Sequence, residues 1–207
     1  MTRGQRGFSL LELIIALAIL GAMVAIMFGG LRMGVRAWQR GEATALALQH
    51  SRSLTQILEQ ALMGIHAYQG TPEPEGRRVL LFQGDAERLG FVTVSPPVPL
   101  SPIVAFTAVS LSVEAPEGGG PPALAIREKA LPNLDPFEAT RPVLVDPTTT
   151  AIRFRYLRDP GGGWEETWDA AVERALPRAV EVTVTTTIND QAVEQPAMIV
   201  PIRATAL

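Results

Sequence analysis

The 207-residue sequence contains no cysteine and only one lysine, Lys129, against 17 arginines and two histidines. The absence of cysteine excludes disulfide bridges, zinc–thiolate sites and cysteine nucleophiles together. The arginines nowhere form a dense run and the formal charge is −3, so the sequence predicts no direct nucleic-acid site.

The motifs that usually carry catalysis are also missing. The sequence has no G-x-x-x-x-G-K-[ST], no G-x-S-x-G, no H-E-x-x-H and no EF-hand loop. His50 and His66 are too far apart to indicate a metal site by themselves. We therefore expect no enzyme activity, no cofactor and no metal. The acidic residues around the Gly161–Gly163 turn leave two readings open, a solvated loop or a Ca²⁺ site: Asp159, Glu165, Glu166 and Asp169.

An uncharged apolar run of 19 residues occupies residues 13–31. As a helix it would be about 28 Å long, close to the thickness of a bilayer's hydrocarbon core. A secretory signal peptide would have a shorter apolar centre and a small-x-small cleavage site, whereas Gly29-Gly30 is followed by Leu31-Arg32-Met33. A plain signal anchor fits the hydropathy. Neither alternative explains Glu12, a carboxylate that costs roughly 2.5 to 3.5 kcal/mol at membrane depth.

The residues before this run carry a resemblance. Arg6-Gly7-Phe8-Ser9-Leu10-Leu11-Glu12-Leu13 resembles the leader junction of type IV prepilins and type II secretion pseudopilins, in which a basic leader ends in Gly, followed by Phe and by Glu at the fifth mature position. The resemblance implies that prepilin peptidase cuts between Gly7 and Phe8 on the cytoplasmic side and N-methylates Phe8. Loss of the two leader arginines would change the formal charge to −5.

The same resemblance gives Glu12 a role in assembly. In the family's fibres the glutamate pairs with the N-terminal amine of a neighbouring subunit. This is physically reasonable, because an opposite charge compensates a carboxylate in a low-dielectric setting and penalises a subunit in the wrong register.

The apolar run continues into an amphipathic pattern. The first proline after it is Pro72, so we predict one helix from near Ser9 to about Tyr68, with Gly34 and Gly41 as weak points. The stripe expected to face the rest of the protein is Ala47, Leu54, Leu58, Ala61 and Ile65, flanked by Leu46, His50, Ile57 and Leu62.

The remaining sequence consists of short apolar runs broken by proline and glycine, which is typical of a β-rich head. The predicted strands are residues 79–82, 89–94, 104–113, 124–129, 151–158, 180–188 and 197–202.

A second resemblance lies in this region. The residues 154–157, Trp164, Trp168 and 176–182 resemble the C-terminal part of the J-type minor pseudopilins of type II secretion, which share a tyrosine-containing strand, a tryptophan and a Leu-Pro-x-Ala-Val sequence before the next strand. From the residues alone, both tryptophans are more typical of packing than of a ligand platform, and Pro177 is expected to stop a short helix.

These observations predict an α+β fold: a long N-terminal helix packed on an antiparallel β-rich head. The expected organisation is a leader over 1–7, a transmembrane and assembly helix over 8–31, an amphipathic continuation over 32–68 and a periplasmic head over 69–207. The resemblances imply a minor pseudopilin or minor pilin in the bacterial inner membrane, near the tip of a type II secretion pseudopilus or type IV pilus. The implied partners are prepilin peptidase, other pilins or pseudopilins and inner-membrane lipid.

Two alternatives stay open. A minor pilin of a type IV pilus would act in twitching, adhesion or DNA uptake. A membrane-anchored periplasmic enzyme belongs to a different class of protein.

Overall fold

The computed structural model describes residues 9–71, 76–99, 104–115, 119–138, 141–188 and 191–203. Gly7 and Phe8, which flank the expected cleavage site, lie outside these residues. The chain divides into two compact units, Met1–Ala47 and Leu48–Leu207. The fold is α+β, as predicted: a long N-terminal helix is followed by antiparallel sheets.

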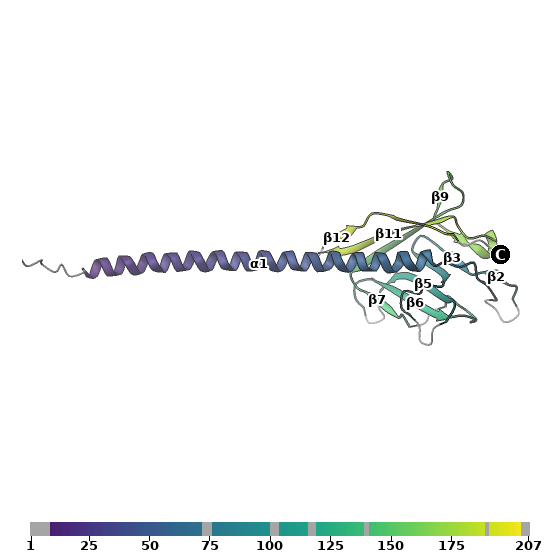
Figure 1. The fold of residues 1–207 in the computed structure, drawn as a ribbon, viewed down its shortest axis with the longest axis horizontal. Coiled ribbons are helices and arrows are strands. Elements are labelled where there is room, and N and C mark those ends of the chain that lie inside the picture. The colour runs from purple at the N-terminus through teal and green to yellow at the C-terminus, as the bar shows by residue number, and fades with distance from the viewer. Residues whose placement is uncertain are drawn as a thin grey trace, which may run out of the picture. The chain divides into compact units, whose positions relative to one another are not determined.

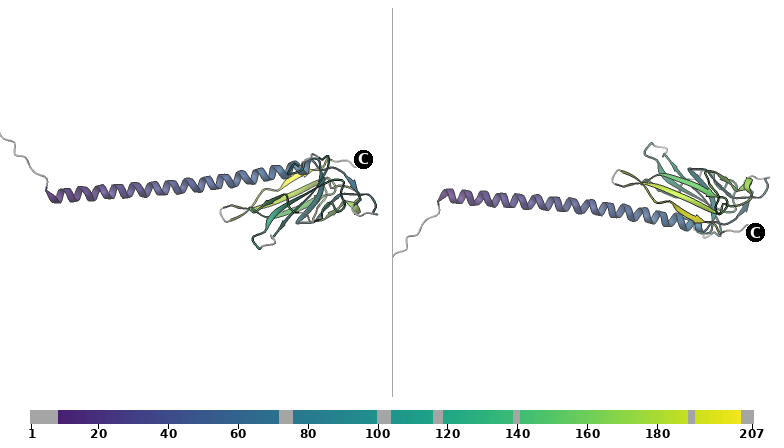
Figure 2. Two further views of the ribbon diagram at one scale, coloured as in Figure 1. Left: turned by 90° about the horizontal axis from the view of Figure 1, so that it is seen from below. Right: turned by 90° about the horizontal axis from the view of Figure 1, so that it is seen from above.

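Helix α1 (Leu10–Met63) is a single uninterrupted helix of 54 residues (Figures 1 and 2). The glycines expected to weaken it, Gly34 and Gly41, lie within it without a break. Each has open space where a Cβ would stand, so neither glycine is required by a neighbouring group of this chain.

The helix ends at Met63, five residues before the predicted end near Tyr68. At Gly64 a Cβ atom would lie 2.6 Å from the hydroxyl oxygen of Thr93. Beyond it, Ile65 forms a β-bridge with Thr93, and the backbone N–H of His66 donates to the carbonyl of Val92 at 2.9 Å. The strand that contains Val92 and Thr93 therefore forms the backbone hydrogen bonds that would have continued the helix. This is a long-range effect, which the periodicity of the sequence does not report.

Within the described residues, the predicted head of residues 69–207 contains three antiparallel sheets, and the second unit adds the last turns of α1 to it. A two-stranded sheet pairs β1 with β2, a six-stranded sheet has the order β10-β3-β4-β5-β6-β7, and a five-stranded sheet has the order β12-β11-β8-β9 with β13 also paired to β11. The elements are β1 (Gln69–Gly70), β2 (Val79–Leu80), β3 (Phe82–Gly84), β4 (Arg88–Thr93), β5 (Thr107–Glu114), β6 (Ala123–Ala130), β7 (Leu144–Asp146), β8 (Thr149–Leu157), β9 (Trp164–Glu165), β10 (Trp168–Asp169), α2 (Ala170–Glu173), β11 (Ala179–Ile188), β12 (Gln191–Glu194) and β13 (Met198–Pro201).

Each of the seven predicted stretches contains strand, although the first divides into β2 and β3. The sequence analysis missed β1, β7, β9, β10 and β12, which have two to four residues each. Such short strands have no measurable alternation, because a period of two needs several residues to be visible.

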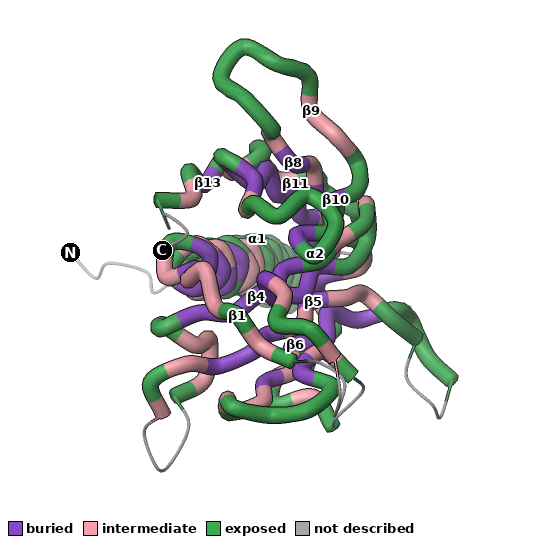
Figure 3. The backbone as a smooth tube through the Cα atoms, turned by 90° about the vertical axis from the view of Figure 1, so that its right-hand side faces the viewer, coloured by how far each residue is buried: buried purple, intermediate pink, exposed green. Residues whose placement is uncertain are grey.

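The core of the head lies where the last turns of α1 meet the two large sheets. Figure 3, seen along the helix, shows α1 between the β8, β11 and β13 group and the β4, β5 and β6 group. The predicted stripe is buried at Leu54, Leu58, Ala61 and Ile65, while Ala47 is only partly covered. Leu62, predicted as a flanking residue, is also buried.

Tyr156 of β8 ties the two large sheets together. Its ring is fully buried and makes an edge contact with Phe82, with the centroids 6.0 Å apart. Its hydroxyl donates to the carbonyl of Asp85 in the β3–β4 turn at 3.0 Å. Burial raises the pKa of Tyr156 well above its ordinary value, so this hydroxyl stays protonated and keeps its role as a donor.

Candidate functional site

The start of α1 carries the residues that the sequence singles out for assembly. Ser9 precedes the helix, and its carbonyl accepts the backbone N–H groups of Glu12 at 3.0 Å and of Leu13 at 3.2 Å. Glu12 therefore lies in the first helical turn. A carboxylate there is favourable to the helix by about 0.3 to 1 kcal/mol, because unpaired N–H groups give this end a partial positive charge.

That local effect is smaller than the cost of the charge in lipid, roughly 2.5 to 3.5 kcal/mol. Within the described residues the Glu12 carboxylate has no hydrogen bond or ion pair. The helix dipole offsets only part of the cost, so a further positive charge from outside the described chain would be stabilising.

The apolar side chains that follow Glu12 are exposed. Leu13, Leu20 and Phe28, for example, are 57%, 57% and 54% accessible. Among the residues that the structure describes, α1 is the one helix that is long and apolar enough to cross a membrane. Such a surface is compatible with an inner-membrane anchor, since it must be covered by lipid or by other apolar helices.

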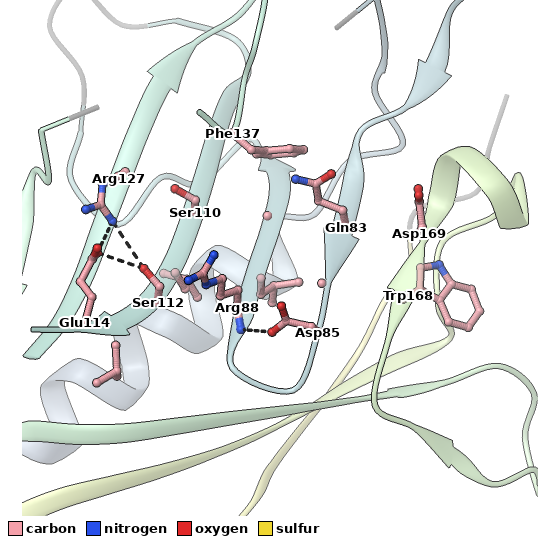
Figure 4. Close-up of a pocket in the computed structure, with 15 residues that line it drawn as sticks. Gln83, Asp85, Arg88, Ser110, Ser112, Glu114, Arg127, Phe137, Trp168 and Asp169 are labelled. Atoms are coloured by element: carbon pink, nitrogen blue, oxygen red, sulfur yellow. Dashed lines mark hydrogen bonds and ion pairs between the residues drawn. The ribbon is translucent and has the colours of Figure 1, made fainter. Parts of the chain in front are cut away.

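In the head, a groove of about 550 Å³ lies on the six-stranded sheet (Figure 4). Its floor includes Gly90, where an added Cβ would lie 3.0 Å from the ring of Phe137. The ring therefore packs directly over the strand and forms one wall. The groove is lined by Gln83, Gly84, Asp85, Arg88, Leu89, Gly90, Ser110, Leu111, Ser112, Val113, Glu114, Arg127, Phe137, Trp168 and Asp169.

Most of the charged and polar groups in this groove have structural partners. Arg127 donates to Glu114 and to Ser112, and the hydrogen bond from Arg127 holds the pKa of Glu114 below its usual value. Asp85 accepts the backbone N–H groups of Glu87 at 2.8 Å and of Arg88 at 2.7 Å, which closes the β3–β4 turn. The Ser112 hydroxyl also donates to Glu114 at 3.1 Å, so the arrangement is a polar surface of side chains that bind one another.

The acidic residues near the Gly161–Gly163 turn do not gather into a cation site. Arg158 lies among them and donates to Glu165 at 2.8 Å and to Glu173 at 2.5 Å. Asp169 instead caps α2 by accepting the N–H of Ala171 at 2.8 Å. Within the described residues, no three His, Asp or Glu side chains are placed to hold a metal ion.

The tryptophans and Pro177 have mainly packing roles. Trp168 is buried, and its indole N–H donates to the carbonyl of Ala175 at 3.0 Å, as expected for a core residue. Trp164 is only partly buried, with Arg155 at 5.8 Å from its ring centroid. The short helix ends before Pro177, because Arg174 adopts a left-handed conformation with φ 57°. Pro177 then leads into β11.

His50 and Asp146 form a contact that the sequence gives no means of finding. The Nε2 atom of His50 lies 3.0 Å from a carboxylate oxygen of Asp146, although 96 residues separate them. Burial opposes ionisation of Asp146, but hydrogen bonds from Thr149, Thr148 and His50 outweigh it and lower the pKa of Asp146. His66 instead stacks on Phe106 with the ring centroids 4.8 Å apart. Each histidine therefore makes a contact within the second unit.

Comparison with known protein families identifies the N-terminal segment. Residues 2–28 match the family model described as the prokaryotic N-terminal methylation motif. No curated protein matches the chain. The match covers the segment that precedes α1 and the apolar first part of that helix, and it does not extend to the head.

Proposed function

Because residues 2–28 carry the methylation motif that marks the type IV pilin and pseudopilin family, we propose that this chain is a minor pseudopilin or minor pilin, a structural assembly subunit. One observation carries the proposal. The motif runs directly into a helix whose apolar side chains are exposed for its whole first part.

Processing is the first step in this proposal. Prepilin peptidase cuts between Gly7 and Phe8 on the cytoplasmic side, removes the leader over residues 1–7 and N-methylates the new amine of Phe8. Residues 8–31 then hold the protein in the inner membrane as a single span. Residues 32–68 continue toward a periplasmic head over residues 69–207.

Assembly then uses the N-terminal end and the apolar surface of the processed segment. The Phe8 amine of one subunit supplies the positive charge that the Glu12 carboxylate of a neighbour lacks. Such a pair would favour one axial register, because a shifted subunit would leave the carboxylate in lipid or among apolar helices. The exposed apolar surface of α1 would exchange lipid for the helices of neighbouring subunits.

The head supplies a rigid contact surface in this scheme. Its short edge strands and its polar groove belong to sheets that share one core, so neighbouring subunits would meet a preformed shape. A position near the fibre tip, where minor subunits start assembly, is suggested by the resemblance of residues 154–157 and 176–182 to J-type pseudopilins. Those residues lie in and beside β8 and β11, the central strands of the five-stranded sheet.

The test is mass spectrometry of the N-terminus of the protein extracted from membranes of cells with active prepilin peptidase. We expect a chain that begins with N-methylated Phe8, and a chain that keeps Met1 in a matched strain without the peptidase. Retention of Met1 in the strain with active peptidase would overturn the proposal.

A separate experiment distinguishes the two kinds of fibre to which the subunit could belong. We favour a type II secretion pseudopilus, and the alternative is a type IV pilus that acts in twitching, adhesion or DNA uptake. Deletion of the gene should abolish secretion of exported proteins in the first case. Loss of piliation or of transformation with normal secretion would instead support the second.

A further inference from the structure

The segment of α1 that follows the apolar run has two unlike faces. Between residues 8 and 51 the arginine and lysine side chains are Arg32, Arg36 and Arg40 and no others. In a helix of 3.6 residues per turn, a spacing of four places successive side chains about 40° apart, so the three arginines share one face. All three are exposed.

The opposite side of the same segment is mostly apolar, with the exposed Glu42 as its one charged residue. Leu31, Val35 and Trp38 are 62%, 48% and 78% exposed. Trp38 lies about 160° around the helix from Arg36. Tryptophan is enriched at the level of lipid headgroups, where an apolar ring and a polar N–H are both satisfied. The apolar surface of the span therefore continues mainly on one side of the helix, while the arginines, with the exposed Met33 beside them, line the other.

The uninterrupted helix sets the depth of these residues. Arg32 directly follows the uncharged run of residues 13–31, and at 1.5 Å per residue Arg36 lies about 6 Å and Arg40 about 12 Å farther along the axis. The headgroup layer on each side of a bilayer is about 5 to 7 Å thick. Arg32 and Arg36 then lie within that layer. Arg40 lies about 5 Å beyond it, a distance over which its flexible side chain can reach back.

We propose that Arg32, Arg36 and Arg40 bind the phosphate groups of anionic phospholipids in the leaflet at the C-terminal end of the span. The inference rests on the proposed function, which places the preceding run in a membrane. Guanidinium groups bind phosphate oxygens in a bidentate manner, and three of them along one face match neighbouring headgroups. The contact holds the subunit at one depth until it is extracted into a fibre.

The occupant is lipid rather than an acidic protein surface because the apolar face is continuous with the span. At the end of a membrane span, the membrane–water interface offers phosphate groups to the arginines on one side of the helix. It also offers an apolar environment to the tryptophan on the other side. An acidic partner would account for the arginines but would leave the exposed ring of Trp38 without an apolar neighbour.

The experiment uses the processed full chain in phosphatidylcholine vesicles with and without phosphatidylglycerol. Spin-labelled phosphatidylglycerol and phosphatidylcholine report which lipid is enriched beside the protein. The test variant is R32Q/R36Q/R40Q. The control is R52Q/R153Q/R203Q, which removes the same charge from exposed arginines elsewhere.

We expect the wild-type chain to prefer phosphatidylglycerol, with each arginine contributing at most about five-fold to the attraction at low salt. The test variant should lose most of this preference and the control should keep it. Among single variants, R32Q and R36Q should each lose more than R40Q. Added salt should reduce the preference of the wild-type chain.

An unchanged preference in R32Q/R36Q/R40Q, or an equal loss in the control, overturns the inference. Loss of fibre assembly in the test variant with its lipid preference intact assigns the arginines to a protein partner and also overturns it. Alkaline extraction separates this result from the proposed function. A chain released from vesicles has no membrane span, which would contradict both the proposed function and the arginine site. A retained chain without lipid preference would contradict the arginine site alone.

Discussion

The two units of this chain differ in the solvent exposure of their apolar side chains. Leu20, in the first part of α1, is 57% exposed, whereas Leu58, near the end of α1, is fully buried. Both belong to one uninterrupted helix. Helix formation is therefore common to both regions, and the difference lies in what covers the side chains.

In the head, the covering groups come from the chain itself. The last turns of α1 contact strands of both large sheets, so the core is complete without a partner. In the first part of α1, nothing in the described chain covers the apolar surface. Its stability in water is that of an isolated helix, and burial must come from lipid or from other subunits.

The largest effect on stability should come from the shared core. Leu58→Ala removes a fully buried side chain and should lower the free energy of unfolding of the head by about 2 to 5 kcal/mol. The matched control is Leu46→Ala, in the same helix but 61% exposed. Near-UV circular dichroism of the full chain in detergent, followed during heating, reports the buried Tyr156 and Trp168. Equal losses in the two variants would contradict the contrast between the regions.

Replacement of glycine by alanine should lower the stability of the head at one position and leave it unchanged at the other. In the head, a Cβ at Gly84 would lie 2.0 Å from the Tyr156 hydroxyl oxygen, so Gly84→Ala should destabilise the head by up to about 3 kcal/mol. In α1, Gly34 has open space around it, and alanine is favoured over glycine in a helix by about 1 kcal/mol. Gly34→Ala should leave the melting temperature of the head unchanged. A drop in that temperature would place Gly34 against a part of this chain.

How far the sequence predicts this structure differs between the regions. The helix and the longer strands carry strong local patterns: the stripe through Leu54 and Leu58 repeats at helical spacing, and β8 alternates between buried and exposed positions. Local patterns report which face is buried, and they do so before the partner is known.

The errors occur where a distant residue decides. The helix ends at Met63 because Thr93 pairs with Ile65, and Asp146 is held by His50 from a different element. The sequence left the acidic loop open between a solvated loop and a Ca²⁺ site, and it gave no sign that Arg158 binds Glu165 and Glu173. The assembly residues are a different case. Gly7, Phe8 and Glu12 are recognised from a motif that, in the resembling family, a peptidase and neighbouring subunits bind. The fold of a single chain therefore gives little information about these residues.

Carboxylates in the head should show opposite dependences on pH. Burial raises the pKa of Glu128, although the backbone N–H of Val98 donates to it at 2.8 Å. A raised folded-state pKa means that stability is highest below the unfolded pKa, about 4.3, and falls as pH rises through the folded value. Glu128→Gln removes that loss, so the melting temperature of the variant should rise relative to wild type between pH 4 and pH 7.

Glu114→Gln is the control with the opposite sign. Because Arg127 lowers the pKa of Glu114, ionised Glu114 stabilises the head above the unfolded pKa and loses this effect as pH falls. This variant should therefore be relatively less stable at pH 7 than at pH 4. The same direction of change in both variants would show that their surroundings do not differ as the structure describes.

Glu12→Val should have no effect on the head and a large effect on assembly. The Glu12 carboxylate has no partner within the described residues, so its removal should leave the melting temperature of the head unchanged and processing largely intact. Incorporation into fibres should fall, because the carboxylate that fixes the register with a neighbour's Phe8 amine is missing.

The measurement compares the amount of variant and wild-type protein in sheared fibres with the amount in membranes. Glu42→Val, a second exposed glutamate of α1, is the matched control. Normal incorporation of the Glu12 variant would contradict the pairing. A loss of head stability in that variant would instead show that Glu12 acts within its own chain, as Glu128 does.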